Sequence, residues 1–271
     1  MSFDSLETSI ADGKPVRLYL FERGLLKWAY NSSNRDITYE GVLYAGVAIS
    51  DDGIRQRGVV SADVLKITAQ HDLPVAQQFK VVAPSAEIAL TIFDLHYSDL
   101  LARVRWSGSI AGVNWPSPES CEIRCESLSA SMEKTGLRMT YGRPCPYTLY
   151  DHRCKASKEA RRVTALVSGL TGISISSGIF GAVPAGYFSG GFVEWEIGQG
   201  ELERRGIERH EGTTLTMLEL THGLSLGMEV HAYPGCDRLI ATCDARFNNR
   251  LNYGGVPGMP GKSPFSNEPL F

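Results

Sequence analysis

Short runs of strand-forming residues, separated by turn-forming residues, dominate the first half of the chain. The first run is Val16 to Phe21 (VRLYLF), which Pro15 precedes and Gly24 follows, and a later run covers 121–127. A run that alternates with period two buries one face of a β-strand, and short strands at regular intervals are typical of a barrel or a sandwich. The predicted fold is therefore mainly β, with a β-barrel domain over residues 1–140.

The pattern changes near Gly142. Residues 143–160 (RPCPYTLYDHRCKASKEA) contain two prolines, clustered charges and two cysteines, which predicts a loop and a short helix. Strand-like runs resume at Val163, and the 28 Gly and 13 Pro of the whole chain favour short strands over long helices. The last 18 residues hold four prolines and cannot form a central strand or a helix. We predict a smaller cysteine domain with short helices over 141–253 and an extended Pro/Gly-rich arm over 254–271.

Charge and hydropathy argue against several classes of protein. The formal net charge is −3, so the chain has no electrostatic attraction for nucleic acid. The N-terminus is acidic and lacks the apolar run of a signal peptide, while Phe3, Leu6 and Ile10 predict a short amphipathic helix. Residues 163–193 carry no charge, but seven Gly and five Ser favour strands and loops over a membrane span. We expect a soluble protein, made in the cytoplasm, without membrane contact.

Six cysteines fall into two groups. Cys121 and Cys125 bracket Ile123 in the sequence CEIRC, so the three side chains share one face of a predicted strand. At ~3.3 Å per residue the two thiols lie roughly 13 Å apart, too far for a disulfide or for one compact metal centre. We interpret both as buried core thiols.

The other four cysteines form two pairs in turn-rich sequence, Cys145-x8-Cys154 and Cys236-x6-Cys243. Without a signal peptide, metal binding or inert thiols are better interpretations than disulfides. Four thiolates suit zinc or an iron–sulfur centre. Neither pair has the tight spacing of a zinc knuckle, and the looser loops fit a [4Fe–4S] cluster slightly better. The spacing alone leaves a cluster, zinc and four ordinary thiols open.

Nothing in the sequence predicts catalysis. The chain has no Walker loop, no dinucleotide-binding glycine motif, no H-E-x-x-H and no G-x-S-x-G. Acids such as Asp51 and Asp94 are scattered, and residues 201–205 are interpreted as a hairpin tip or a solvated face. His152 and His231 could replace a thiolate ligand, although a hydrogen bond beside the ligands fits them better. A small redox protein and a zinc-stabilised binding module are the competing functional classes.

The two cysteine pairs and the sequence after them resemble a known family. Their spacing is similar to that of the cluster-binding domain in tail-tip proteins related to the L protein of lambda-like phages. Residues 236–261 (CDRLIATCDARFNNRLNYGGVPGMPG) resemble the end of tail hub (baseplate hub) proteins of siphophages and gene transfer agents. There a cysteine leads into R-F-x-N, here Arg246 to Asn249, and then into an aromatic-Gly-Gly step, here Tyr253 to Gly255. The opening runs VRLYLF and DITYEGVLY also resemble the family's first barrel strands.

The resemblance implies both a fold and a function. The N-terminal part would be a tail-tube-like β-barrel hub domain, and three copies would form a ring at the distal end of a long non-contractile tail. That homotrimer would contact the ring of the distal tail protein on one side and the central fibre or receptor-binding complex on the other. The virion protein would hold a structural [4Fe–4S] cluster through Cys145, Cys154, Cys236 and Cys243, and it would not be an enzyme.

Side chains near the predicted ligands suggest how a cluster would be enclosed. Aromatic rings would shield it from water, and arginines would offset the charge of the thiolates. The aromatic candidates are Tyr147, Tyr150, Tyr233 and Phe247, and the arginine candidates are Arg143, Arg153 and Arg246. The long linker between the two pairs leaves the detailed fold of 163–230 open.

Overall fold

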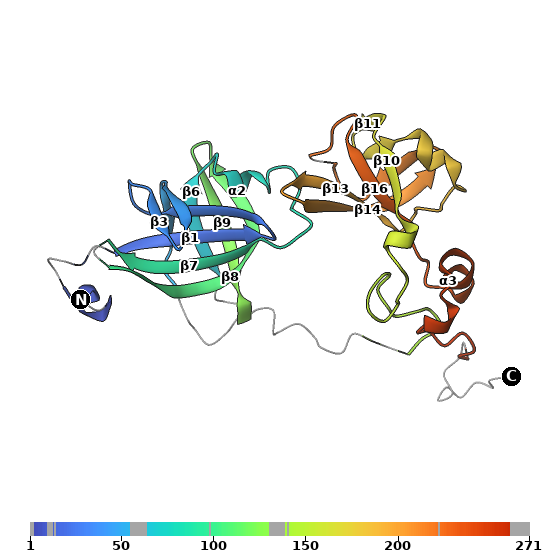
Figure 1. Ribbon diagram of the computed structural model, residues 1–271, viewed down its shortest axis with the longest axis horizontal. Coiled ribbons are helices and arrows are strands. Elements are labelled where there is room, and N and C mark those ends of the chain that lie inside the picture. Colours follow the sequence, from blue (N-terminus) through green and yellow to red (C-terminus); the bar gives the residue numbers. More distant parts are fainter. Residues whose placement is uncertain are drawn as a thin grey trace. The chain divides into compact units, whose positions relative to one another are not determined.

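The computed structural model divides into two compact units, which Figure 1 shows as ribbons. The first unit comprises residues 1–134 and 197–203, and the second comprises residues 135–196 and 204–271. Strands dominate both units, which confirms the mainly β prediction. The structure describes residues 3–9, 13, 15–54, 64–97, 99–129, 139, 141–221 and 223–260.

The described part of the first unit has two short α-helices and a nine-stranded sheet. Its elements are α1 (Phe3–Glu7), β1 (Pro15–Arg23), β2 (Leu26–Asn31), β3 (Ile37–Tyr39), β4 (Val42–Gly46), β5 (Ile49–Asp51), β6 (Leu65–Gln70), α2 (Pro74–Gln77), β7 (Ala89–His96), β8 (Asp99–Ser117) and β9 (Ser120–Ser127).

The sheet of the first unit curls into a barrel. Its strand order is β3-β4-β2-β1-β7-β8-β9-β6-β5, so β5 forms one end of the sheet and β4 lies next to the other end. Only Val47 and Ala48 separate β4 from β5 along the chain. Two residues span less than about 11 Å, so the two ends of the sheet must meet. The predicted N-terminal barrel is thus present.

Alternate residues of β1 enter two separate core clusters. Tyr19 and Phe21 point into the larger cluster, whereas Val16 and Leu18 pack in a smaller one on the opposite face. Because both faces of the strand are buried, the run VRLYLF is almost wholly apolar. The β9 thiols of Cys121 and Cys125 are fully buried in the larger cluster, as the period-two argument predicts.

A short N-terminal helix packs on this barrel. In α1, Phe3 and Leu6 are buried, as predicted, whereas Ile10 lies outside the described residues. The ring of Phe3 meets the ring of His96 edge-on, with 5.0 Å between the ring centroids. The guanidinium carbon of Arg103 lies 4.5 Å from the centroid of the Phe3 ring. The helix is therefore anchored through one aromatic side chain and one aliphatic side chain.

A polar network crosses the mouth of the first barrel. Arg17 donates to both carboxylate oxygens of Asp51 at 2.7 Å and to Asp94 at 2.8 Å, and the Tyr19 hydroxyl donates to Asp51 at 2.7 Å. These residues line an open cavity of about 750 Å³. Asp51 and Asp94 are therefore members of an ion-pair network, which corrects their interpretation as scattered surface acids.

This network makes the first unit sensitive to acid. Burial alone would raise the pKa of Asp51, but hydrogen bonds from Arg17 and Tyr19 outweigh it and lower the pKa below its usual 3.8. The stabilisation is complete above the unfolded-state pKa and is lost as pH falls through the lower folded-state value. We expect Asp51→Asn to cost about 1.5–3 kcal/mol at pH 7 and the gap from the native protein to narrow below pH 4. The test is the free energy of unfolding in urea, measured for both proteins at pH 7 and below pH 4. A difference between the two proteins that does not change with pH would contradict the prediction.

In its described residues, the second unit has a seven-stranded sheet, three short 3-10 helices and one α-helix. Its elements are η3 (Glu159–Arg161), β10 (Val163–Leu166), β11 (Gly169–Thr171), β12 (Ser174–Ser176), η4 (Gly178–Ala182), β13 (Phe192–Gly198), β14 (Glu201–Glu211), β15 (Thr214–Met217), β16 (Glu229–Tyr233), α3 (Ile240–Phe247) and η5 (Arg250–Asn252). The adjoining ends of β13 and β14, residues 197–203, are the part that belongs to the first unit.

This second sheet also closes on itself. The strand order is β10-β16-β13-β14-β15-β12-β11, and its two end strands follow one another in the chain with only Val167 and Ser168 between them. Val167 donates to Met228 at 3.0 Å and Ser168 donates to Ser176 at 2.9 Å, so the backbone bonding continues across the closure. Large buried side chains fill the interior, among them Trp195, Phe180, Phe188 and Tyr233.

The structure differs from the sequence predictions in two places. The helix predicted within 143–160 is only the 3-10 turn η3. Short helices were predicted over 141–253, and α3 is the α-helix found there, at a position that the sequence did not indicate. Residues 201–205 are not a uniformly solvated face, because Glu203 and Arg205 are each only 5% exposed. Among the described residues, no helix combines the length and the apolar character needed to cross a membrane.

Candidate functional site

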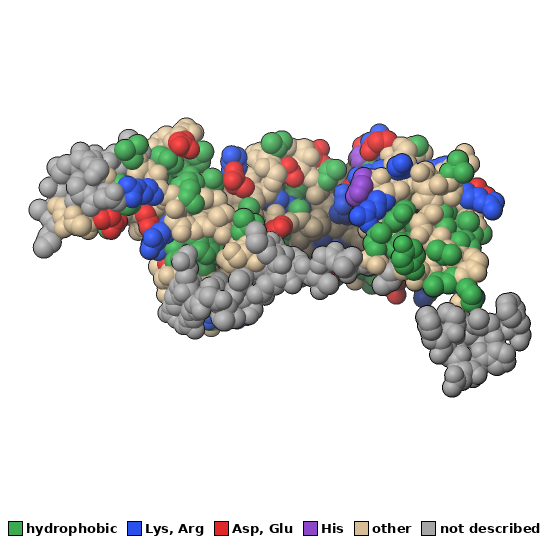
Figure 2. Space-filling view, turned by 90° about the horizontal axis from the view of Figure 1, so that it is seen from below, with side chains coloured by type: hydrophobic (Ala, Val, Ile, Leu, Met, Phe, Trp, Pro, Cys, Tyr) green, Lys and Arg blue, Asp and Glu red, His purple; other side chains and the backbone are tan. Residues whose placement is uncertain are grey.

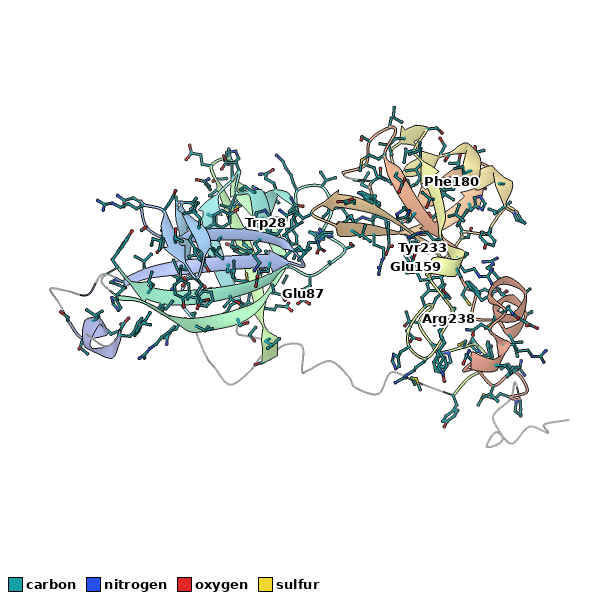
Figure 3. The ribbon with its side chains drawn as sticks, viewed as in Figure 1. Trp28, Glu87, Glu159, Phe180, Tyr233 and Arg238 are labelled. Atoms are coloured by element: carbon teal, nitrogen blue, oxygen red, sulfur yellow. The ribbon has the colours of Figure 1, made fainter. Side chains whose placement is uncertain are left out.

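The four paired cysteines line one pocket in the second unit. The pocket has a volume of about 340 Å³ and takes Cys145 and Cys154 from the loop before η3, Cys236 from the loop after β16, and Cys243 from α3. Cys154 and Cys243 are buried, and Cys145 and Cys236 are half-buried. Figure 3 labels Arg238, which lies in the loop that leads into α3 and lines the same pocket. The structure thus brings together the predicted ligand set, whose role as ligands stays a prediction.

An aspartate turn holds the first pair in place. The Oδ1 atom of Asp151 accepts hydrogen bonds from the backbone of Cys154 at 2.6 Å and of Arg153 at 2.9 Å. The carbonyl of Asp151 also accepts the backbone N–H of Lys155 at 2.9 Å. An Asp side chain that bonds its own backbone two or three residues on is a common turn-forming device. It fixes the direction of Cys154 without a helix.

A second aspartate organises the loop of Cys236. Asp237 accepts the backbone N–H of Leu239 at 2.9 Å and the hydroxyl of Thr242 at 2.7 Å, at the start of α3. The backbone N–H of Arg238 donates to the sulfur of Cys236 at 3.4 Å. The loop therefore provides one N–H donor to the sulfur of a predicted ligand, an interaction that tunes metal thiolates.

A close backbone crossing explains a glycine beside the second pair. A Cβ at Gly235 would lie 2.0 Å from the carbonyl oxygen of Ser189, so only glycine fits between the two backbones. Arg246 closes the crossing by donating to the carbonyls of Gly235 and Tyr187. Arg246 is thus a structural residue of this crossing, and its role in offsetting thiolate charge stays a prediction.

Asn249 links the two cysteine pairs. Its side-chain amide donates to the carbonyl of Cys154 and lies 3.7 Å from the Cys154 sulfur, and its own carbonyl accepts the thiol of Cys243 at 3.4 Å. The asparagine is only 8% exposed. One buried residue therefore contacts a cysteine of the first loop through its side chain and a cysteine of the helix through its backbone carbonyl.

The start of the predicted arm is tied to the first cysteine loop. The Tyr253 hydroxyl lies 2.7 Å from the carbonyl of Arg143 and 2.9 Å from that of Arg238. Val256 donates to Gly142 at 2.8 Å, and Arg143 Nε donates to the carbonyl of Met259 at 2.6 Å. Residues 253–259 therefore close the site from one side, and Arg143 serves this contact. The rest of the arm, 261–271, lies outside the described residues.

The thiols of this pocket repel one another when ionised. Burial, followed by the charges of the other three cysteines, raises the pKa of Cys243 to about 11, and the same causes together with Asp237 raise the pKa of Cys236. Without a cation the pocket therefore favours neutral thiols, and metal binding must release protons. In the described part of the chain, no group of three or more His, Cys, Asp or Glu side chains could hold a single metal ion.

Aromatic rings form one wall of the site. Tyr147, Phe192, Phe247 and Tyr253 line the pocket. Tyr150 and Tyr233 are packed behind them, since Tyr150 meets Phe192, Tyr233 and Phe247 edge-on at 6.0–6.3 Å. Of the four predicted shielding residues, Tyr147 and Phe247 reach the pocket directly, while Phe192 and Tyr253 were not predicted.

Two positive side chains line the pocket, Arg204 and Arg238. The sequence analysis assigned Arg204 to a hairpin tip or a solvated face and so missed it. The predicted substitutes for a thiolate lie elsewhere: His152 is exposed on the first loop, and His231 on β16 contacts Thr164 at 3.1 Å. Glu203 and Arg205 are buried. Because successive side chains of a strand point to opposite faces, Arg204 faces away from both, and this alternation is the signal that could have placed it.

The second unit also exposes several large hydrophobic side chains. Leu218 and Leu226 are each 65% exposed, and Leu251 is 99% exposed. Figure 2 shows hydrophobic side chains interspersed with Lys and Arg on the visible face of this unit.

Comparisons with known proteins give a family match and a fold match. The family described as "Phage conserved hypothetical protein BR0599" matches residues 186–263, which include the second cysteine pair. An uncharacterized protein of Xylella fastidiosa (strain 9a5c) is 28% identical in an alignment 185 residues long, and the alignment covers 63% of this chain and 38% of that protein. The chain thus matches well under half the length of that relative.

The fold is similar to that of a chain in a solved virion. The structure described as "Virion of native gene transfer agent (GTA) particle" contains a chain with a TM-score of 0.79 and 18% sequence identity. The similarity covers 96% of this chain and 93% of that chain. Nearly the whole chain therefore shares its fold with a virion component.

Proposed function

We propose that the chain is a structural component of a phage-type virion, in the hub ring at the distal end of a long non-contractile tail. It binds a [4Fe–4S] cluster through Cys145, Cys154, Cys236 and Cys243 and has no catalytic role. The observation that carries the proposal is the convergence of four cysteines, from two loops distant in sequence, on one pocket.

The pocket suits a cluster in chemistry and in size. Soft thiolate ligands select iron–sulfur clusters or zinc over hard cations. A cluster is wider than one ion, and the pocket of about 340 Å³ has room for it. The Arg238 N–H and the Asn249 amide already point at ligand sulfur atoms. When bound, the cluster would supply iron–thiolate bonds that cross-link the two loops.

A cross-link has a clear structural purpose in this part of the second unit. Residues 141–158 and 234–260 contribute no strand to the sheet, and α3 has only eight residues. So small a region buries too little apolar surface to hold itself firmly, and metal ligation can provide the missing free energy of folding. The cluster would hold the arm segment 253–259 in place through the loop of Cys145.

The comparisons support a role in virion assembly. The fold match is a virion component, and the family match over residues 186–263 is described as a phage protein. The hub resemblance adds a homotrimeric ring between the distal tail protein and the central fibre or receptor-binding complex. Exposed apolar residues such as Leu251 are suited to such subunit contacts.

Assembly in vivo tests the hub role. Deleting the gene from the phage-like element that encodes it should remove joined tails from particles seen by negative-stain electron microscopy. The native gene and the Cys121→Ser gene should restore them, whereas Cys236→Ser should not. Normal tailed particles after the deletion would contradict the proposal.

A further inference from the structure

An ion triad centred on a buried carboxylate lies beside the cysteine pocket. Glu194 on β13 is fully buried, and it accepts hydrogen bonds from Lys158 Nζ and from Arg204 Nε, both at 2.8 Å. Burial would raise the pKa of Glu194, but these two cations outweigh it and keep the pKa below its usual range. The triad therefore holds one carboxylate and two cations, a net positive charge.

The two cations of the triad occupy different surroundings. Arg204 lines the cysteine pocket, and its guanidinium carbon lies 4.8 Å from the ring centroid of Phe192, another pocket residue. Lys158 lies 4.8 Å from the ring centroid of Tyr233, which stacks on Phe192 at 4.7 Å. Tyr233 is labelled in Figure 3, at the end of β16. The structure thus places Arg204 in the pocket wall and holds it there through a buried carboxylate.

We infer that Arg204 raises the reduction potential of the bound cluster and that Glu194, which binds it, partly offsets its charge. The inference rests on the proposed cluster. One-electron reduction converts [4Fe–4S]²⁺ to [4Fe–4S]⁺, so an assembly with four thiolates passes from doubly to triply negative. A nearby fixed cation stabilises the more negative state, and local charge is one of the factors that set cluster potentials.

The triad predicts shifts of opposite sign for its two members. Arg204→Gln removes a positive charge from the pocket wall and should make the potential more negative. Glu194→Gln removes a negative charge and should make it more positive, by a smaller amount because the carboxylate lies behind the arginine. If a substitution only loosened the packing of the site, both variants should change the reduction potential in the same direction. Changes of opposite sign therefore distinguish an electrostatic effect from a packing effect.

The test is a redox titration of the full chain under anaerobic conditions, with dithionite as the electron donor and a series of viologen dyes as mediators. Arg204→Lys keeps the charge and should stay near the native potential. Arg250→Gln removes an arginine that is paired with Asp244 at 3.8 Å and does not line the pocket, so it should leave the potential unchanged. Iron content and circular dichroism check that each variant is loaded and folded.

The outcomes separate this inference from the proposed function. The inference would be overturned if the reduction potential of Arg204→Gln equalled that of the native protein, or if Arg204→Gln and Glu194→Gln shifted it in the same direction. Either result would leave the proposed cluster unaffected. If Arg204→Gln fails to load iron, Glu194→Gln and Arg204→Lys provide the test instead. Of these two, only Glu194→Gln should have a reduction potential more positive than that of the native protein. A native chain without a cluster would overturn the proposed function and this inference with it.

Discussion

Cys236→Ser should lose nearly all bound iron and should loosen the cysteine part of the second unit. Serine cannot replace a soft thiolate ligand, and ligation free energy is folding free energy in small metal-bound regions. We expect amide hydrogen exchange to rise by at least tenfold over residues 142–155 and 236–256, while β13 to β15 keep their protection. Cys145→Ser should behave in the same way, because it removes a ligand from the other loop.

Cys121→Ser is the matched control for these variants. Cys121 is fully buried, but it lies in the barrel of the first unit, where its thiol donates to the carbonyl of Gln70 at 3.2 Å. A serine hydroxyl can donate to the same carbonyl, so the cost should stay near 1–2 kcal/mol and the iron content should be unchanged. Equal iron in Cys236→Ser and Cys121→Ser would show that the pocket cysteines are not ligands.

Glu203→Gln should destabilise the first unit by about 3–5 kcal/mol, because it leaves a buried arginine without its counterion. The side chains of Arg23 and Glu203 are 1% and 6% exposed and lie 2.5 Å apart. The second oxygen of Glu203 accepts the backbone N–H of Ser85 at 2.9 Å. After the substitution the Arg23 guanidinium would face a neutral amide and the carbonyl of Leu202 at 3.4 Å.

Urea unfolding followed by the emission of Trp28 and Trp106, which pack on the first core, measures this cost. Glu22→Gln, in the exposed pair with Lys27, provides the control and should cost no more than about 1 kcal/mol. The double variant Arg23→Met with Glu203→Leu should recover most of the loss, since it removes both buried charges. A Glu203→Gln protein as stable as Glu22→Gln would contradict the account.

The strands of the first unit were predictable from their apolar runs. VRLYLF is almost wholly apolar, CEIRC alternates with period two, and the burial of Cys121 and Cys125 follows from that alternation. The boundaries were less predictable: β8 runs to Ser117, because strand length depends on the partners β7 and β9. Closure of both sheets depends on pairings between distant strands, which no local pattern encodes.

In the candidate site, the four cysteines were predictable from type and spacing, but their surroundings were not. Asn249 reaches both pairs only because α3 ends in a left-handed turn at Asn248 and brings the next residue back toward Cys154. Arg204 and Glu194 lie on neighbouring strands and meet through sheet pairing. A charged cluster such as ELERR is usually solvated, so its division into a buried Glu203 and a pocket-lining Arg204 required the tertiary structure.

The central claim is that Cys145, Cys154, Cys236 and Cys243 hold an iron–sulfur cluster. The most direct measurement is purification of the full chain without oxygen, followed by a visible spectrum and analysis for iron, sulfide and zinc. The account predicts a brown protein with broad absorbance near ~400 nm and about four irons and four sulfides per chain. A well-folded, colourless protein that contains no iron, whether free of metal or holding one zinc, would contradict it.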